Sequence, residues 1–276
     1  MEILGTLHRH TDFASALVAP RNVDVWLPPG YTAGSTAYPV VYMHDGQNLF
    51  DPALAYGGVD WGLDEAVVRL MQAGQIEGAI VVGIWNTGDD RWREYMPRKA
   101  LAAPGAIERF GQEAGGEPLS DRYLEFLVGE LKPFVDEHYR TLPGRQHTFV
   151  MGSSMGGLIS LYALCEYPGV FGGAGCLSTH WPALGNQGLP GIVLDDLPRA
   201  LPTPGAHRLY FDYGTETLDA EYEPYQQRAD AILRAVGYRP GVDWLTRRFE
   251  GAEHSERSWR ERVHIPLLFL LKGGAA

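Results

Sequence analysis

The stretch that decides the fold is residues 147–157, which reads His147-Thr148-Phe149-Val150-Met151-Gly152-Ser153-Ser154-Met155-Gly156-Gly157. A short apolar run ends here in the pattern Gly-x-Ser-x-Gly, and the helix-compatible residues 158–166 follow at once. A serine on a sharp strand-to-helix turn adopts a strained backbone, which glycines two residues away accommodate without a side-chain clash. Such a turn exposes the hydroxyl and points a helix N-terminus at any anion formed beside it. The pattern predicts that Ser154 is a nucleophile, and the alternative is a structural glycine-rich turn.

A serine nucleophile needs a base, and four histidines follow Ser154 in the chain. His254 stands in a loop after the strand-like residues 244–249 and before a terminal helix, where a side chain can project over the sheet edge. His207 directly precedes the strand 208–213, at the end away from the sheet edge that carries Ser154, and is expected at the surface. His264 falls within the last helix pattern. We therefore predict that His254 is the base, and that His180, after the strand 173–177, contacts the substrate.

The base in turn needs an orienting carboxylate, which on a doubly wound hydrolase sheet lies between the serine and the histidine in the chain. Asp212 lies inside the strand 209–213 and is expected to point sideways, whereas Glu216 and Asp219 occupy the following loop. We favour Asp219 because it directly precedes a helix that begins near Glu221. Asp219 could instead cap that helix, and Glu216 remains the alternative acid.

These motifs together resemble the esterase D-like "putative esterase" group of α/β-hydrolases, over nearly the whole chain. The group includes feruloyl and acetyl-xylan esterases, siderophore esterases and S-formylglutathione hydrolase. Many relatives carry the acid three residues after the glycine that corresponds to Gly214, where this chain has Thr217, so the resemblance leaves the acid open. The matching segments are residues 42–51, 81–86, 93–97, 152–157, 214–219 and 251–254, with Trp259.

Attack on an ester carbonyl builds negative charge on oxygen, which preorganised backbone N–H groups stabilise. One donor should be Met155, which follows the nucleophile, and the other should come from the loop after the strand 39–43. Within that loop we favour the N–H of Gln47, with Gly46 next. His44 and Asp45 could suggest a metal site, but no partner stands at ligand-like spacing, so we expect them to brace the loop and predict no metal.

Composition narrows the class of protein. The 276 residues fit a single α/β domain spanning 1–276, and 34 acidic against 23 basic residues give a net charge of −11. This charge disfavours nucleic acid and anionic membranes as partners. The N-terminus lacks a signal-peptide pattern and no run is long enough to span a membrane, so we expect a cytoplasmic protein. Cys165 and Cys176 are expected to be buried thiols, although a disulfide between them is possible.

Strand-like and helix-like segments alternate along the chain, which predicts an α/β-hydrolase fold with a mostly parallel sheet and helices on both faces. Pro133 should kink the helix between residues 120 and 138. The expected strands span residues 2–8, 22–27, 39–43, 79–85, 149–151, 173–177, 208–213 and 244–249, and the expected helices span residues 60–72, 120–138, 158–166, 222–236 and 256–271.

Two long segments, residues 86–116 and 179–205, interrupt this alternation. Loops of such length inside a compact domain are usually functional or disordered, and both follow strands that should end on the Ser154 side of the sheet. We interpret them as walls of the substrate pocket. Trp92, Tyr95 and Trp181 could stack on a sugar or aryl group, or could equally fix the loops to the core.

The sequence therefore predicts a serine esterase without a cofactor that acts on a small-molecule ester, possible substrates being esters of sugars or aryl acids. A thioesterase of the S-formylglutathione hydrolase type and an acyltransferase would use the same residues. The alternative of a different class is an inactive hydrolase fold that serves as a binding module. That alternative usually loses a member of the triad, whereas serine, acid and histidine are all present here in order.

Overall fold

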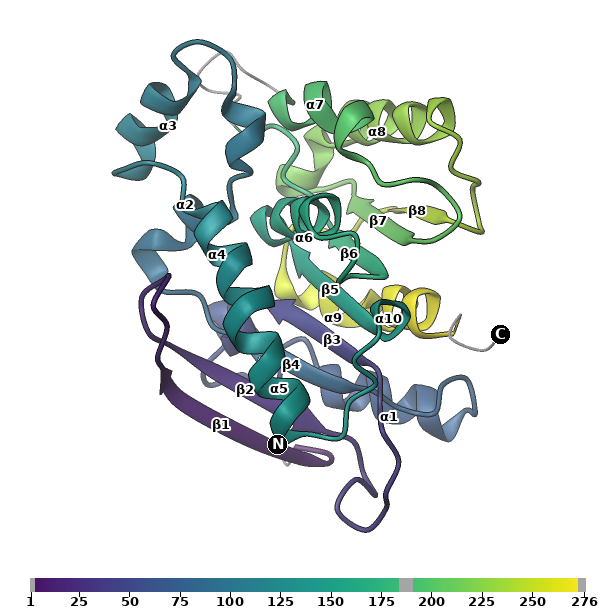
Figure 1. Ribbon diagram of the computed structural model, residues 1–276. Coiled ribbons are helices and arrows are strands. Elements are labelled where there is room, and N and C mark those ends of the chain that lie inside the picture. Colours follow the sequence, from purple (N-terminus) through teal and green to yellow (C-terminus); the bar gives the residue numbers. More distant parts are fainter. Residues whose placement is uncertain (1–2, 184–190, 273–276) are drawn as a thin grey trace.

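The computed structural model describes residues 3–183 and 191–272. Its strands form one sheet in the order β1-β2-β4-β3-β5-β6-β7-β8 (Figure 1). Strands β3 to β8 run parallel, whereas β1 and β2 pair antiparallel, which confirms the predicted mostly parallel α/β fold. The strands are β1 Thr6–Phe13, β2 Arg21–Leu27, β3 Val40–His44, β4 Ile80–Ile84, β5 Thr148–Ser153, β6 Gly173–Leu177, β7 Arg208–Gly214 and β8 Trp244–Phe249.

Helices cover both faces of the sheet because its central strands are apolar on both sides. In β3, Val40 and Tyr42 join one core cluster, whereas Val41 and Met43 join the other. Helices α2 to α8 contribute to the first cluster, and α1, α9 and α10 contribute to the second. The helices are α1 Leu63–Gln72, α2 Arg91–Tyr95, α3 Ala106–Ala114, α4 Ser120–Phe126, α5 Lys132–His138, α6 Met155–Glu166, α7 Ile192–Ala200, α8 Glu223–Ala235, α9 Glu256–Arg262 and α10 His264–Leu271.

Several boundaries differ from the prediction. The first strand was expected at residues 2–8 but runs from Thr6 to Phe13. The terminal helix is divided into α9 and α10 on either side of Val263. A π-helical turn, Leu127–Leu131, joins α4 to α5 just before Pro133. Proline has no N–H to donate to the preceding turn, and a π-helical turn is one way in which a continuous helix accommodates such a local defect.

The two long segments are more regular than predicted. Residues 86–116 contain α2 and α3, and residues 179–205 contain α7, while residues 184–190 of the second segment lie outside the described part. Both follow parallel strands, β4 and β6, at the same sheet edge as β5. Their starting ends therefore lie beside Ser154, as expected, although the segments are helical connections and not irregular loops.

The positions of His207 and of the two cysteines can also be compared with the predictions. His207 was expected at the surface but is buried, with its Nε2 atom 2.8 Å from the carbonyl oxygen of Pro168. Cys165 and Cys176 are free thiols.

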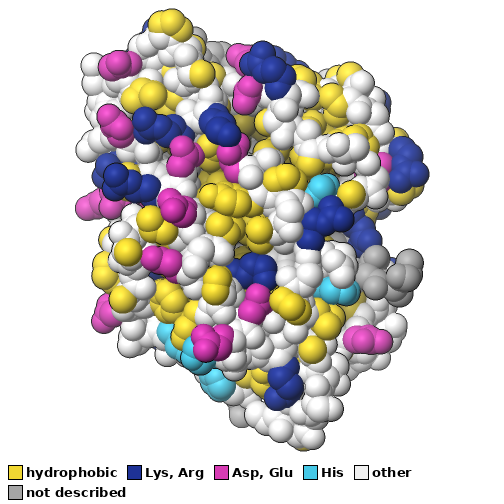
Figure 2. Space-filling model, in the orientation of Figure 1, with side chains coloured by type: hydrophobic (Ala, Val, Ile, Leu, Met, Phe, Trp, Pro, Cys, Tyr) yellow, Lys and Arg dark blue, Asp and Glu magenta, His cyan; other side chains and the backbone are white. Residues whose placement is uncertain are grey.

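Among the described residues, no helix is long and apolar enough to span a membrane. On the face in Figure 2, acidic and basic side chains are interspersed and no extended patch carries a single charge.

Candidate active site

Ser154 occupies the turn between β5 and α6, at the sheet edge where the parallel strands end. Its backbone angles are φ 57° and ψ −121°, a conformation that L-residues rarely adopt and that costs about 1–3 kcal/mol. The turn is tight, because a Cβ atom on Gly152 would lie 2.9 Å from the carbonyl carbon of Gly156. The residues around the serine thus form the strained strand-to-helix turn that the sequence predicted.

Asp219 and His254 meet beside this turn. The Oδ1 atom of Asp219 lies 2.6 Å from the Nδ1 atom of His254, and only 1% of Asp219 is exposed. Asp219 lies in the 3₁₀ helix Thr217–Glu221 after β7 and does not cap α8, whose N-cap position is Tyr222 without a side-chain cap. Glu216 is exposed, and its backbone N–H donates to the carbonyl oxygen of Ala252. The geometry therefore brings Asp219 to the histidine ring and places Glu216 in solvent.

The second carboxylate oxygen of Asp219 is held by a buried network. It accepts hydrogen bonds from the Ser178 hydroxyl and from the Gly214 N–H, both at 2.6 Å. The Ser178 hydroxyl accepts in turn from Trp259 at 3.0 Å and from Arg262 at 2.8 Å. Burial alone would raise the pKa of Asp219, but the hydrogen bonds from His254, Ser178 and Gly214 outweigh it and hold this pKa below its ordinary value. Asp219 is thus kept ionised.

Asp212 belongs to the same network without touching the histidine. It is fully buried, and its Oδ1 atom accepts from the guanidinium of Arg262 at 3.0 Å and from the Ser178 N–H at 3.1 Å. Its Oδ2 atom accepts from the Tyr210 hydroxyl at 3.0 Å. As a buried positive charge, Arg262 is balanced by Asp212 and by Asp219 at 3.8 Å. In its strand position, Asp212 therefore supports the buried network around Asp219.

Thr217, the residue that departs from the family pattern, contacts the backbone of the histidine. Its hydroxyl oxygen accepts a 2.8 Å hydrogen bond from the His254 N–H, and its own φ is 55°. A β-branched residue is rare in this left-handed region, so the surrounding structure must stabilise the turn. The His254 ring itself packs edge-on against Trp259 and Tyr222, with centroid distances of 5.0 Å and 5.7 Å. Both the backbone and the ring of His254 are thus held in place.

The two predicted oxyanion donors stand at the starts of helical turns. Met155 is the first residue of α6, and Gln47 lies in the 3₁₀ helix Gly46–Asn48, so neither N–H has an acceptor within its helix. Gly46 is required by a close approach to the sheet, because a Cβ atom there would lie 2.3 Å from the carbonyl carbon of Gly83. Asp45, at φ 57°, accepts two 2.7 Å hydrogen bonds from Arg91. The loop that contains Gln47 is therefore held against the sheet at Gly46 and by Arg91 at Asp45.

His44 lies beneath the same loop. It is buried, and its Nδ1 atom is 2.8 Å from the Tyr123 hydroxyl. Burial lowers its pKa to about 3, so it is neutral at ordinary pH. Within the described part of the chain, no group of three or more histidine, cysteine or acidic side chains is arranged to hold a metal ion.

A cavity of about 410 Å³ opens over Ser154 and His254. Most of the residues that line it are of polar types, and they include an arginine, two carboxylates and three side-chain amides beside two aromatic rings. One of these rings, Tyr56, is 79% exposed and begins the 3₁₀ helix Tyr56–Gly58. The lining residues are Asp45, Gln47, Asn48, Tyr56, Asn86, Arg91, Ser153, Ser154, His254, Glu256 and Trp259.

None of the four predicted substrate contacts is among the described residues that line this cavity. Tyr95 and Trp181 are at most 1% exposed, and the Trp181 indole donates to Gln226 at 2.9 Å, so both fix their segments to the core. Trp92 packs edge-on against Phe110. The stacking alternative is therefore wrong for Tyr95 and Trp181, whose rings offer no accessible face.

His180 is placed differently from the other three. Its backbone N–H donates to the carbonyl oxygen of Ser154 at 3.1 Å, and its Nδ1 atom lies 2.7 Å from the Tyr222 hydroxyl. A role for His180 in substrate contact stays a prediction.

Sequence reasoning missed Tyr56, Arg91, Ser178 and Tyr222, of which only Tyr222 carries a local signal, three residues after Asp219.

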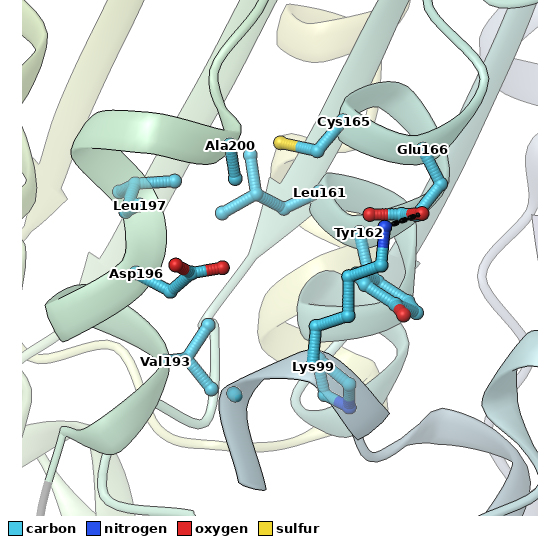
Figure 3. Close-up of a pocket in the computed structure, with 11 residues that line it drawn as sticks. Lys99, Leu161, Tyr162, Cys165, Glu166, Val193, Asp196, Leu197 and Ala200 are labelled. Carbon is cyan, nitrogen blue, oxygen red and sulfur yellow. Dashed lines mark hydrogen bonds and ion pairs between the residues drawn. The ribbon is translucent and has the colours of Figure 1, made fainter. Parts of the chain in front are cut away.

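A second crevice lies between α6, α7 and the 3₁₀ helix Arg98–Leu101 (Figure 3). Its volume of about 30 Å³ would admit one water molecule. An ion pair between Lys99 and Glu166 closes one side, and burial raises the pKa of Cys165, which lines it, to about 12. The thiol is therefore protonated, and this crevice is no candidate for the reaction site.

Residues 14–264 match the family described as "Putative esterase". The chain is 27% identical over 162 residues to the uncharacterized protein YbbA of Bacillus subtilis (strain 168), a match that covers 58% of each chain. The chain thus spans little more than half the length of this curated relative.

Solved structures show the same fold at low identity. A ferulic acid esterase superimposes with a TM-score of 0.70 and 19% identity, covering 98% of this chain and 99% of that one. The enterobactin esterase FES of Shigella flexneri gives a TM-score of 0.69 and 20% identity, covering 98% of this chain and 60% of that one. The family match extends from the second strand of the sheet to the start of the last helix, and the chain belongs to the "Putative esterase" family of α/β-hydrolase fold.

Proposed function

We propose that this protein hydrolyses carboxylic esters, with Ser154 as the nucleophile, His254 as the base and Asp219 as the orienting acid. The observation that carries the proposal is the 2.6 Å hydrogen bond between Asp219 and His254, at the edge of a cavity that Ser154 also lines. A buried carboxylate on Nδ1 fixes the imidazole tautomer and leaves Nε2 to accept a proton. Membership of an esterase family supports the same reaction class.

The chemistry follows from these positions. The Ser154 oxygen attacks the ester carbon while its proton passes to His254 Nε2, and the carbonyl electron pair moves onto oxygen. Collapse of this intermediate breaks the bond to the leaving alcohol, which takes the proton from His254. A water molecule then repeats the two steps on the acyl-enzyme and releases the acid. We assign the N–H groups of Met155 and Gln47 to the developing oxyanion, because both are free of intrahelical acceptors.

The cavity lining favours a small ester that carries polar groups. Arg91, Asn86 and Glu256 present charges and amides that suit hydroxyl or carboxyl substituents, and they would oppose a long alkyl chain. Tyr56 offers an exposed ring, held by a 2.9 Å hydrogen bond from its N–H to Asn48. An aryl or sugar group could stack on this ring. Esters of aryl acids or of sugars therefore fit the site better than long-chain acyl esters.

Hydrolysis of a panel of esters tests the function and the substrate class together. We expect turnover of p-nitrophenyl acetate, and a higher kcat/KM for methyl ferulate or an acetylated sugar than for p-nitrophenyl esters of long acyl chains. Faster turnover of S-formylglutathione than of every oxygen ester would assign a thioesterase instead. Absence of turnover on the whole panel would contradict the proposal and favour a binding module.

Replacement of Tyr56 tests the stacking surface. Tyr56→Ala should raise KM for phenyl acetate about threefold to tenfold, the loss expected for one aromatic contact, and leave ethyl acetate almost unchanged. Tyr56→Phe should behave like the wild type because the ring is kept. Leu54→Ala serves as the control, since Leu54 is exposed in the same segment but does not line the cavity. Equal changes for both esters would assign Tyr56 no part in recognition.

Activity should fall as the pH is lowered, because only neutral His254 can accept the serine proton. Burial lowers the pKa of His180 to about 4, so this histidine stays neutral above about pH 5 and contributes nothing to the change. The pKa of Asp219 lies below its ordinary value, so the acid is ionised throughout. The measurement is kcat/KM for p-nitrophenyl acetate from about pH 5 to about pH 9. A profile that is flat on its acid side would exclude a histidine base.

A further inference from the structure

Ser178 is a strained and fully buried residue at the end of β6. Its φ is 40°, in the region that residues other than glycine rarely adopt, and none of its surface is exposed. Its N–H donates to the Asp212 carbonyl oxygen at 2.9 Å, and the carbonyl of the preceding Leu177 accepts from the Ser154 N–H at 2.9 Å. The strained residue therefore lies where the strand of the nucleophile and the strand before the acid are joined, and strain of this kind gathers at functional sites.

The direction of each hydrogen bond at the Ser178 hydroxyl is determined by its partners. The Trp259 indole at 3.0 Å and the Arg262 guanidinium at 2.8 Å can only donate. They use both lone pairs of the Ser178 oxygen, so its single proton is left for the Oδ2 atom of Asp219 at 2.6 Å. The hydroxyl is thus fixed as a donor to the acid.

Arg262 acts in this network through one nitrogen atom. Its Nη2 atom donates to Ser178 and, at 3.0 Å, to Asp212, and it lies 3.8 Å from the Oδ2 atom of Asp219. The Nε and Nη1 atoms are buried without a hydrogen-bond partner among the described residues, and the guanidinium lies over the Phe249 ring at 4.9 Å. A buried charge with so few hydrogen bonds contributes little to stability. Its position beside the acid suggests a different role.

The charges in the network sum to one excess negative charge, from Asp212 and Asp219 against Arg262. Burial raises the pKa of Asp212, but all three of its hydrogen bonds come from donors, which oppose this rise and favour the carboxylate. When His254 takes the serine proton, the imidazolium adds one positive charge and balances the excess. Because an unbalanced buried charge is costly, the network favours this imidazolium.

We propose that Ser178 and Arg262 are positioning residues that hold the catalytic acid toward its histidine, and that Asp212 balances the arginine charge so that the imidazolium can form. The inference rests on the proposed ester hydrolysis. No proton leaves the network during the reaction: the proton of Ser154 passes to His254 and then to the leaving alcohol, while the Ser178 proton stays on its own oxygen.

The other titratable or charged groups that the described residues place around His254 lie on neighbouring elements or across the cavity. Apart from Asp219, they are Asp45, Arg91, His180, Tyr222 and Glu256. All five are kept in the variants below, so a difference in pH dependence between variants reports the charges of Arg262 and Asp212.

Asp212→Asn removes one charge and keeps the hydrogen bonds. The amide oxygen can accept from Arg262 and from the Ser178 N–H, and the amide N–H₂ can donate to the Tyr210 hydroxyl, which accepts as well as donates. The uncompensated arginine then opposes the imidazolium, so protonation of His254 should need a lower pH. We expect the midpoint of the acid limb of kcat/KM for p-nitrophenyl acetate to move down by about one pH unit.

Removal of the opposite charge as well should restore the midpoint. Arg262→Met alone would leave a buried carboxylate that takes up a proton, but Arg262→Met combined with Asp212→Asn keeps the wild-type excess of one negative charge. Arg262→Lys, which keeps the charge, should also keep the midpoint. Glu94→Gln is the matched control, since Glu94 forms another buried ion pair with Arg21, at 2.8 Å, and neither residue lines the cavity. It should lower the melting temperature without moving the midpoint.

Ser178→Ala removes the hydroxyl that holds the acid. We expect kcat to fall about tenfold with KM almost unchanged, because the lost hydrogen bond acts on Asp219 and not on the substrate. Ser120→Ala is the matched control, since Ser120 is also fully buried and its hydroxyl oxygen accepts from the Arg98 N–H at 3.0 Å, outside the cavity. This control should keep the wild-type kcat, and equal losses in the two variants would overturn the role of Ser178.

The outcomes separate this inference from the function on which it rests. An unshifted acid limb in Asp212→Asn, or a double variant shifted as far as the single one, would overturn the role of the two charges and leave ester hydrolysis intact. A downward shift that the double variant reverses would support it. If the double variant does not fold, the shift in Asp212→Asn against an unshifted Glu94→Gln decides alone. If Ser154→Ala kept wild-type turnover, the proposed function would fail first, whatever the network variants did.

Discussion

Ser154→Ala should reduce ester turnover by about four to six orders of magnitude, because the members of a catalytic triad act as a unit and no other group can form the acyl-enzyme. The fold should survive the change. Alanine is smaller than serine, and the strained φ of 57° at this position is imposed by the surrounding turn. The measurements are kcat for p-nitrophenyl acetate and the melting temperature, of which only the first should change.

Ser153 provides the matched control for this experiment. It is the neighbouring serine, is buried at the end of β5 and lines the same cavity, yet it lies in the strand and outside the turn. Ser153→Ala should keep most of the activity. Phenylmethanesulfonyl fluoride should label the wild type and Ser153→Ala with one equivalent and leave Ser154→Ala unlabelled. Loss of labelling in Ser153→Ala alone would place the nucleophile at the wrong serine.

The sheet and the serine turn could be predicted because their signals are local. Buried parallel strands are short continuous apolar runs, and the predicted strand 244–249 coincides with β8. The turn at Ser154 is set by the steric needs of a few neighbouring residues, so Gly152 and Gly156 mark it in the sequence. His254 could be selected because it follows a strand that had already been located.

The walls of the site could not be predicted, because their signals are not local. Helix α3 has only nine residues and lies between Gly105 and Gly115, both of which adopt left-handed angles, so the glycines suggested a loop. The sequence shows that Trp181 and Tyr95 are aromatic residues in long connections. It does not show whether an aromatic ring faces a ligand or fills the core, since both need apolar area, and the structure places these two rings in the core. For the same reason, the sequence does not show that the ring of Tyr56 lines the cavity.

The choice of acid also depended on three-dimensional geometry. Glu216 and Asp219 both follow β7, and their separation in sequence is a single turn. The left-handed conformation of Thr217, with φ 55°, redirects the chain between them. As a result Glu216 faces solvent and Asp219 enters the buried network below His254. No pattern of residue types predicts a threonine in the left-handed backbone conformation, because β-branched residues rarely adopt it.

Asp219→Asn should lower kcat by about four orders of magnitude, because an amide cannot hold the His254 tautomer that accepts the serine proton. The structure also predicts a loss of stability, of about 1–3 kcal/mol, because Asp219 does not cap a helix but accepts from three donors. An amide N–H₂ group turned toward Ser178 or Gly214 leaves a buried donor unpaired, and one turned toward His254 imposes the wrong tautomer on the ring. The pKa of Asp219 is lower in the native state, so this stabilisation is present above about pH 4 and is lost as the pH falls through the native pKa.

Glu216→Gln is the control for the acid, because Glu216 is exposed and only its backbone contacts the His254 loop. It should change neither kcat nor the free energy of unfolding, measured in urea at neutral pH. An inactive Glu216→Gln together with an active Asp219→Asn would move the acid to Glu216 and show that the loop rearranges in solution. If Asp219→Asn loses stability but keeps activity, the carboxylate supports the buried network alone. The combined loss of activity and stability therefore distinguishes a catalytic acid inside a structural network from either role by itself.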